Sequence, residues 1–259
     1  MKVSRAIVMT FVWVTAALLY NAGIYYGQGP QKALEFLTGY VIELSLSVDN
    51  LFVFLLIFSY FRVPASQQSR ILSWGILGAQ LMRGIFIFAG LALLNRFHWL
   101  MYVLGAFLVF TGFKLFIEKS KKVAPQGNPV LNLAKHYFPG LSTFALVLIV
   151  IETTDLIFAV DSIPAILAIS LDTFIVFTSN VFAILGLRAL YFALCGMMDK
   201  FHLMHYGLGG ILFFIGIKMV IHHFIDVPIV FTLSFIASVL TASIVASIVY
   251  PKKEGHEKK

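Results

Sequence analysis

Acidic residues interrupt two stretches of sequence that are otherwise apolar enough for the interior of a membrane. One stretch reads ELSLSVDN over residues 43–50, and the other reads ETTDLIFAVDSIP over residues 152–164. A carboxylate at the centre of a bilayer is costly, so each of these acids needs a compensating proton, cation or ion pair. Five of the twelve Asp and Glu residues are in this position: Glu43, Asp49, Glu152, Asp155 and Asp161.

Polar side chains recur at helical spacing around these acids. Glu43, Ser47 and Asn50 share one face of a helix, and residues 152, 155, 159 and 162 share one face of another. Pro164 cannot donate to the carbonyl of residue 160, which leaves a further oxygen acceptor beside Asp161. Carboxylate, amide, hydroxyl and carbonyl oxygens are hard ligands that suit Mg²⁺, Ca²⁺ or Mn²⁺. The candidate metal ligands are Glu43, Asp49, Asn50, Glu152, Asp155, Asp161 and Ser162.

Softer metals find fewer suitable ligands in this chain. Six of the seven histidines fall in expected loops or at the ends of apolar segments, and the seventh is in the C-terminal tail. Cys195 is the single cysteine, so an internal disulfide and a cysteine-based metal cage are both excluded. The sequence therefore predicts a hard divalent cation and disfavours zinc and copper sites.

The second acid of each stretch leaves two arrangements open. Asp49 and Asp161 follow Glu43 and Asp155 by six residues, which places them about 120° around a straight helix. Either the helices unwind locally and all the acids converge, or Asp49 and Asp161 face a different neighbour. The two acidic segments are also long for a bilayer, which predicts that each is tilted or interrupted, and Pro164 favours an interruption in the second.

Four basic residues offer an alternative explanation for the acids. They fall within or at the ends of apolar segments, and as charge-pairing or gating residues they could form a purely structural lattice of ion pairs. Five acids less four bases leave one formal negative charge. Lysines at the ends of spans can also extend to the membrane surface without any partner. These basic residues are Arg83, Arg188, Lys114 and Lys218.

The elements that must position these residues are membrane helices. The chain is 60% hydrophobic and 12% charged with mean hydropathy +0.93, far from the roughly 25% charged residues of soluble domains. Segments of about 20 apolar residues, enough to cross a bilayer, recur along nearly the whole chain. We expect an all-α polytopic membrane protein with about eight spans. They are Ala6–Tyr26, Ala33–Tyr60, Ile71–Leu94, Phe97–Ile117, Leu141–Ile169, Phe174–Met197, Leu203–Ile221 and Val227–Tyr250.

The distribution of positive charge predicts the orientation. With eight spans both termini share one side, which carries thirteen of the nineteen Lys and Arg residues, whereas the other side carries two. This positive-inside asymmetry predicts cytoplasmic termini and a location in the bacterial inner membrane. It also accounts for the net charge of +7 without a nucleic-acid partner. The expected surroundings are the lipid bilayer, and the sequence names no protein partner.

Three motifs occur twice, in the same order. GAFLVFTGFK at 105–114 matches GGILFFIGIK at 209–218, MRGIFIF around Arg83 matches LRALYF around Arg188, and ELSLSVDN matches DLIFAVDS at 155–162. The duplicated unit contains three helices, an odd number, so the second copy enters the membrane from the opposite face. We predict one transmembrane domain over residues 1–259, with inverted repeats at about 33–117 and 141–223. A cytoplasmic linker at 118–140 and flanking helices at 6–26 and 227–250 complete it.

Three segments carry a resemblance to a known family. ELSLSVDNLFVF, ETTDLIFAVDSIPAI and NVFAILGLRALYFAL resemble the signature segments of the TerC family of integral membrane proteins, which is named for tellurium resistance. The resemblance covers about residues 33–223. It implies a LysE-like fold with inverted three-helix repeats, manganese export, and links to metal homeostasis and alkaline pH. It also points to Glu43, Asp49, Asp155 and Asp161, with Asn50 and Glu152 adjacent, as the functional acids.

The resulting hypothesis is a secondary transporter and not an enzyme. It would export Mn²⁺ above all, with Ca²⁺ or Mg²⁺ as other candidates, in exchange for protons through a carboxylate cluster near the midplane. No permanently bound cofactor is expected. Two alternatives remain: a proton or monovalent-cation pathway through the same acids, and a membrane protein of assembly or partner binding that docks through residues 118–140.

Overall fold

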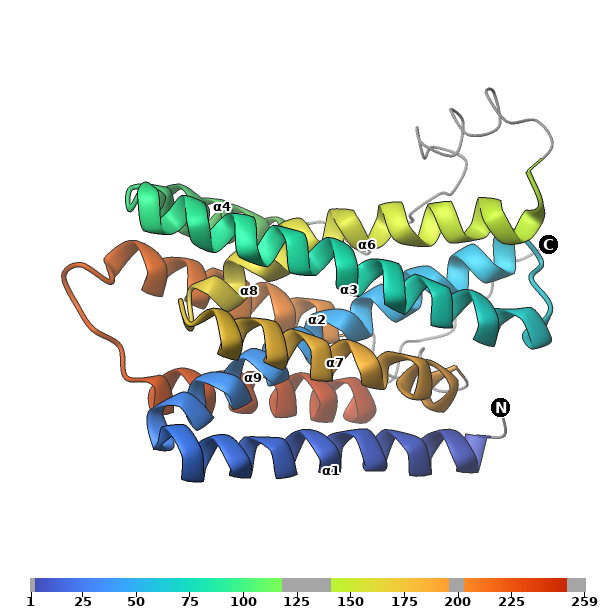
Figure 1. Ribbon diagram of the computed structural model, residues 1–259, viewed down its shortest axis with the longest axis horizontal. Coiled ribbons are helices and arrows are strands. Elements are labelled where there is room, and N and C mark those ends of the chain that lie inside the picture. Colours follow the sequence, from blue (N-terminus) through green and yellow to red (C-terminus); the bar gives the residue numbers. More distant parts are fainter. Residues whose placement is uncertain (1–2, 118–140, 196–202, 251–259) are drawn as a thin grey trace.

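The chain folds into a bundle of long helices. A computed structural model describes residues 3–117, 141–195 and 203–250, and every regular element in these ranges is an α-helix (Figure 1). The predicted linker at 118–140 lies outside the described residues. The helices are α1 Val3–Gln28, α2 Pro30–Tyr60, α3 Ala65–Arg96, α4 Leu100–Ile117, α6 Thr143–Leu167, α7 Thr173–Leu194, α8 Met204–Ile221 and α9 Ile229–Val249.

The described helices confirm the eight predicted spans. Each contains a window apolar and long enough to cross a membrane, and each overlaps the span expected at its place in the sequence. The largest difference is in α3, which begins at Ala65, six residues before the expected Ile71. The added turn reads ASQQSR and is polar. Hydropathy locates the part of a helix that fits hydrocarbon, not the part that continues beyond it.

Local sequence sets several helix ends. Gly29 adopts a φ of 95°, which a residue with a side chain rarely adopts, and Pro30 follows at the first position of α2. The side chain of Ser142 accepts from the amide of Ala145 at the start of α6. Asp172 caps α7 by accepting from the first two helical amides beyond Thr173. These short connections force consecutive helices to run antiparallel.

α2 is the central helix of the bundle. In its most apolar window 69% of the residues are buried, against 11% for both α1 and α9. α2 packs most extensively on α7, and also on α1, α6 and α9. α6 packs chiefly on α3, and α4 packs on α8. The acidic segment of α2 therefore lies on a helix that is surrounded by other helices, whereas only 33% of the corresponding window of α6 is buried.

The closest helix contact joins α4 and α8 through glycines. A β-carbon placed on Gly112 would lie 2.6 Å from the carbonyl oxygen of Gly209, and one on Gly216 would lie 2.7 Å from that of Gly105. Both distances are far below a van der Waals contact, so the two backbones touch at two points. Small residues of this kind are the usual means of close packing between membrane helices.

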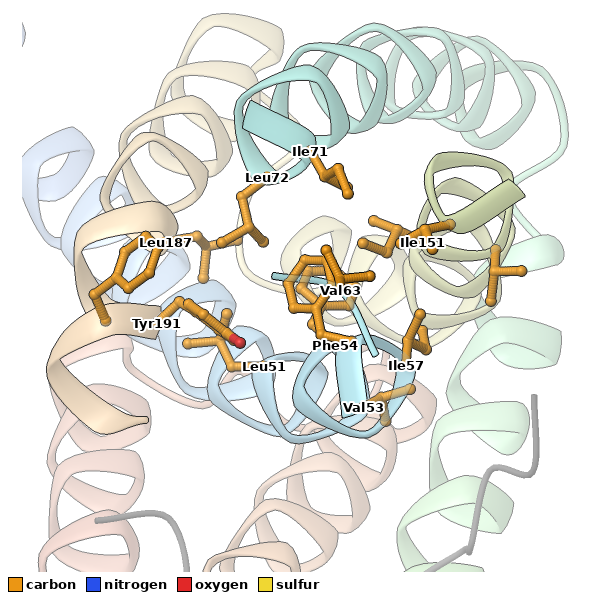
Figure 2. Close-up of a cluster of buried hydrophobic side chains, with 14 of the residues drawn as sticks. Leu51, Val53, Phe54, Ile57, Val63, Ile71, Leu72, Ile151, Leu187 and Tyr191 are labelled. Atoms are coloured by element: carbon orange, nitrogen blue, oxygen red, sulfur yellow. The ribbon is translucent and has the colours of Figure 1, made fainter. Parts of the chain in front are cut away.

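An apolar core fills the bundle on one side of the acidic helices. Figure 2 shows Leu51, Phe54 and Ile57 of α2 facing Ile151 of α6 and Leu187 of α7. All five side chains are buried. This core holds α2, α3, α6 and α7 together.

The predicted interruption of α6 is wrong. The helix runs from Thr143 to Leu167 with Pro164 inside it, and α2 is likewise one helix. In Figure 1 the second half of α6 turns away from the line of its first half. A proline removes one backbone hydrogen bond, and a helix packed among neighbours accommodates this by bending.

Candidate functional site

Arg83 of α3 lies at the centre of a buried charge cluster. Its side chain is fully buried. Nε and Nη2 donate to the two carboxylate oxygens of Asp155 on α6, both at 3.0 Å. Nη1 donates to Glu43 of α2 and, at 3.2 Å, to the hydroxyl of Ser162 on α6. The planar guanidinium fits a carboxylate in this two-pronged way. These four residues are called the Arg83 cluster below.

The Arg83 cluster carries more negative than positive charge. Two ionised carboxylates and one guanidinium leave one formal negative charge. The Oε1 atom of Glu43 also accepts from the hydroxyl of Ser47 at 3.3 Å, whereas its Oε2 atom is buried with no hydrogen-bond partner among the described residues. A buried carboxylate oxygen without a donor is costly. It therefore favours a proton or a cation at this position.

Helical spacing predicted part of this arrangement. Asp155 and Ser162, seven residues apart on α6, both contact Arg83, as residues on one helix face must. Glu43 and Ser47 interact in the same way on α2. Asn50, the third residue of that face, is buried. The two acidic faces identified in the sequence thus meet each other across the side chain of Arg83.

Glu152 lies one turn before Asp155 and occupies a notch in α3. A β-carbon on Gly78 would lie 2.5 Å from Cδ and 2.7 Å from Oε2 of Glu152, so a side chain here would displace the carboxylate from its position. Glu152 is half-buried, and its Oε2 atom is buried without a hydrogen-bond partner among the described residues. Gly78 was not among the residues predicted from the sequence, although a glycine within a membrane helix often marks the close approach of another helix.

The second acid of α6 is separate from the contacts of Arg83. Asp161 is half-buried on the continuous helix α6, and Arg83 does not bind it. Six residues of unbroken helix turn it away from Asp155, as the second of the two expected arrangements requires. The backbone at Asp49 is helical, but its side chain is outside the part of the chain that the structure describes.

The other basic candidates occupy different surroundings. Arg188 is exposed on α7, and its Nη1 atom donates to the hydroxyl of Ser73 at 2.8 Å. Lys114 is partly buried in the last turn of α4. Lys218, in the last turn of α8, is 8% exposed and lines a cavity at the end of the bundle. Only the first arginine of the duplicated pair therefore belongs to the Arg83 cluster.

A second charged network, not foreseen from the sequence, ties the start of α2 to the connection between α6 and α7. Lys32 lies 3.2 Å from Glu35 and 3.0 Å from Asp172, and the hydroxyl of Ser170 donates to Glu35 at 2.5 Å. Partial burial raises the pKa of Asp172, but the hydrogen bond from Lys32 and those from two amides of α7 outweigh it, so the pKa is lowered.

The described side chains do not form a ready metal cage. Among residues 3–117, 141–195 and 203–250, no three His, Cys, Asp or Glu residues with described side chains are grouped closely enough to hold a metal ion. In the Arg83 cluster the guanidinium stands between Glu43 and Asp155 and takes their oxygens. The carboxylate oxygens are hard metal ligands, but in this arrangement they bind the guanidinium of Arg83.

The model of the "Integral membrane protein TerC family" matches residues 28–255 of the chain. The chain belongs to the TerC family. The match includes the Arg83 cluster and all but the first of the eight membrane helices. No solved structure matches the chain significantly.

Several relatives are similar to this chain over more than four-fifths of their own length. An uncharacterised membrane protein of Myxococcus xanthus is 46% identical over 266 residues, which cover 96% of this chain and 83% of the relative. A protein of Salmonella typhi named "Putative membrane-bound redox modulator Alx" is 45% identical over 271 residues, covering 95% and 84%. Its namesake in Escherichia coli K12 is 43% identical over the same length and shares. This chain is thus a multi-pass membrane protein of the TerC family.

Proposed function

We propose that this TerC chain is a secondary transporter that exports a hard divalent cation, Mn²⁺ above all, in exchange for protons through the Arg83 cluster. One observation carries the proposal: two membrane helices bring buried carboxylates together with an excess of one negative charge and an oxygen of Glu43 without a donor. Intramembrane acids arranged in this way generally belong to ion or proton pathways.

Arg83 has a defined role in this proposal. A guanidinium and a divalent cation compete for the same oxygens, so Arg83 is the internal counter-cation of the unloaded site. Entry of the transported ion displaces it from at least one carboxylate, and return of Arg83 helps to expel the ion. Glu152, half-buried against Gly78, is the acid of the region best placed to carry the exchanged proton, because Arg83 does not bind it.

Helix packing supports the inverted repeat that such a transporter would use. α2 packs chiefly on α7, and the equivalent helix α6 packs chiefly on α3, which is the equivalent of α7. The third helices, α4 and α8, pack on each other through equivalent glycines. These reciprocal contacts are what a two-fold axis in the membrane plane would produce. The excess of positive charge on the side of the termini supports cytoplasmic termini in the inner membrane.

The proposal is tested by Mn²⁺ flux into proteoliposomes that contain a pH-sensitive dye. The native chain should move Mn²⁺ with an opposing proton signal, and Asp155→Asn should lose at least about tenfold of both, because even outer-shell partners of a metal site typically cost about 10–100-fold when they are mutated. Asp172→Asn, outside the Arg83 cluster, is the matched control and should retain the flux. Asp161→Asn tests the second acid of α6 in the same assay. Full Mn²⁺ flux in a folded Asp155→Asn variant would overturn the assignment.

The hydrogen bonds between Arg83 and Asp155 favour a second candidate function, a membrane protein that assembles with partners. Both oxygens of Asp155 are occupied by one guanidinium, as expected for a structural ion pair in a membrane protein that assembles with partners. In that case the native chain would move no Mn²⁺, and Asp155→Asn would alter only stability. The redox role in the relatives' name would require more than thiol exchange within one chain, since Cys195 is the only cysteine.

A further inference from the structure

A cavity lies at the end of the bundle where α6 and α8 end and α9 begins. Its volume is about 470 Å³, and it is separate from the residues of the Arg83 cluster. Polar side chains of Gln31, Ser170, Lys218, His222 and Asp226 line it, together with apolar residues of α6, α8 and the first turn of α9. Neither the proposed transport nor the family match assigns a role to this cavity.

Lys218 is the unusual residue of the cavity. The residue is only 8% exposed, and no hydrogen bond or ion pair joins its ammonium group to another described residue. A charged amine that is nine-tenths buried is costly unless an anion or several acceptors meet it. The position in the last turn of α8 gives it some support from the helix dipole, but leaves its donors available to the cavity.

The first turn of α9 supplies further donors at the same place. α9 begins after Pro228, which provides no side-chain cap, and the first amide of the helix with a backbone partner is that of Thr232, bonded to the carbonyl of Pro228 at 3.1 Å. Ile229 and Val230 line the cavity. Their amides, like all amides of a first turn, have no partner within the helix. An uncapped helix start of this kind favours an anion.

Negative groups near the cavity do not cancel this preference. Asp226 lines the cavity, but 88% of its side chain is exposed, and it lies 3.8 Å from His222. Glu35 is held by Lys32 and Ser170. The carbonyl ends of α6 and α8 favour a cation, which Lys218 itself provides. An anion inside the cavity would therefore face the buried ammonium and the first turn of α9.

We propose that this cavity binds the phosphate of a lipid headgroup. The chain beside the cavity exposes large apolar side chains: Phe224 is 81% exposed, Ile225 59%, and Val230 and Phe231 57% each. At the end of membrane helices such side chains lie against lipid, so a ligand with a phosphate and acyl chains matches both the charged interior and the apolar surroundings.

The test is the thermal stability of the purified full chain in detergent, with phosphatidylglycerol, phosphatidylcholine or inorganic phosphate added. Phosphatidylglycerol should raise the unfolding temperature by several degrees and more than phosphatidylcholine, because a ligand of the native state stabilises it. Lys218→Gln should abolish this difference, whereas Lys218→Arg should keep it. Lys114→Gln is the matched control, since Lys114 ends the duplicated motif but does not line the cavity.

Each result decides the proposal. A phosphatidylglycerol effect that survives in Lys218→Gln would overturn the site. An equal effect of inorganic phosphate would overturn the lipid assignment and identify a soluble anion as the ligand. If Lys218→Gln fails to fold, the lipid preference of Lys218→Arg decides in its place, because a charge-dependent site should keep it and a site without an anion should show none.

Discussion

Replacement of Arg83 by an uncharged residue should lower the unfolding temperature of the protein strongly. In Arg83→Met, both oxygens of Asp155 lose their guanidinium donors, and Glu43 loses its donor from Arg83. Loss of one partner of a buried ion pair typically costs about 3–5 kcal/mol. For a chain of this size, 1 kcal/mol corresponds to roughly 2–4 °C by the scaling of soluble proteins. We therefore expect a decrease of about 10 °C.

Two further variants separate charge from packing in this experiment. Arg188→Met removes the equivalent arginine, which is exposed and makes one hydrogen bond to Ser73, so its unfolding temperature should change by no more than about 2 °C. The triple variant Glu43→Gln, Arg83→Met, Asp155→Asn removes all three charges and should recover at least half of the loss, since uncharged replacements of buried ion pairs are well tolerated.

The measurement is thermal unfolding in detergent at neutral pH, followed by tryptophan fluorescence. Arg83→Met within 2 °C of the native chain would show that the Arg83 cluster contributes little to stability. A loss in Arg188→Met as large as that in Arg83→Met would refute the distinction between a buried and an exposed arginine at equivalent positions.

Three further variants test other parts of the structure. In Gly112→Ala the new methyl group would meet backbone atoms of α8, so this variant should lose about 1–3 kcal/mol in thermal unfolding, whereas Gly27→Ala, with open space around it, should not. The pKa of Asp172 is lowered from its ordinary value of 3.8 in the folded protein, so the ionised side chain stabilises the fold above pH 3.8. This contribution disappears as the pH falls through the lower pKa of the folded state. Asp172→Asn should therefore be less stable than the native chain at neutral pH but equally stable in strong acid. Gly78→Ala should displace the flexible end of Glu152, with a small change in unfolding temperature but a clear loss of Mn²⁺ flux; unchanged flux would remove Glu152 from the proposed proton path.

Hydropathy and helical spacing predicted the helices and the two acidic faces, because both depend on local sequence. Arg83 and Asp155 are 72 residues apart in the sequence, and their pairing depends instead on how α3 and α6 are rotated toward each other. Arg83 and Arg188 occupy equivalent motifs, yet one is buried and the other exposed. A duplicated motif predicts a shared backbone, but the neighbours of each copy decide whether a side chain meets an acid or water.

Residues without chemistry of their own were the hardest to foresee. Gly78 matters only because the carboxylate of Glu152 lies against it, and the sequence has many other glycines in membrane helices. Pro164 predicted an interruption that the structure does not have, since α6 continues through it. In both cases the outcome depends on the packing of a neighbouring helix, which periodicity does not describe.

The two glycine contacts between α4 and α8 also restrict how the molecule can move. The contacts Gly105–Gly216 and Gly112–Gly209 are two helical turns apart along α4, and a pair of rods that touch at two points can neither roll nor slide past each other without collision. α4 and α8 therefore form one rigid pair. Any alternation of the Arg83 cluster between the two sides of the membrane must come from α2, α3, α6 and α7 turning around it.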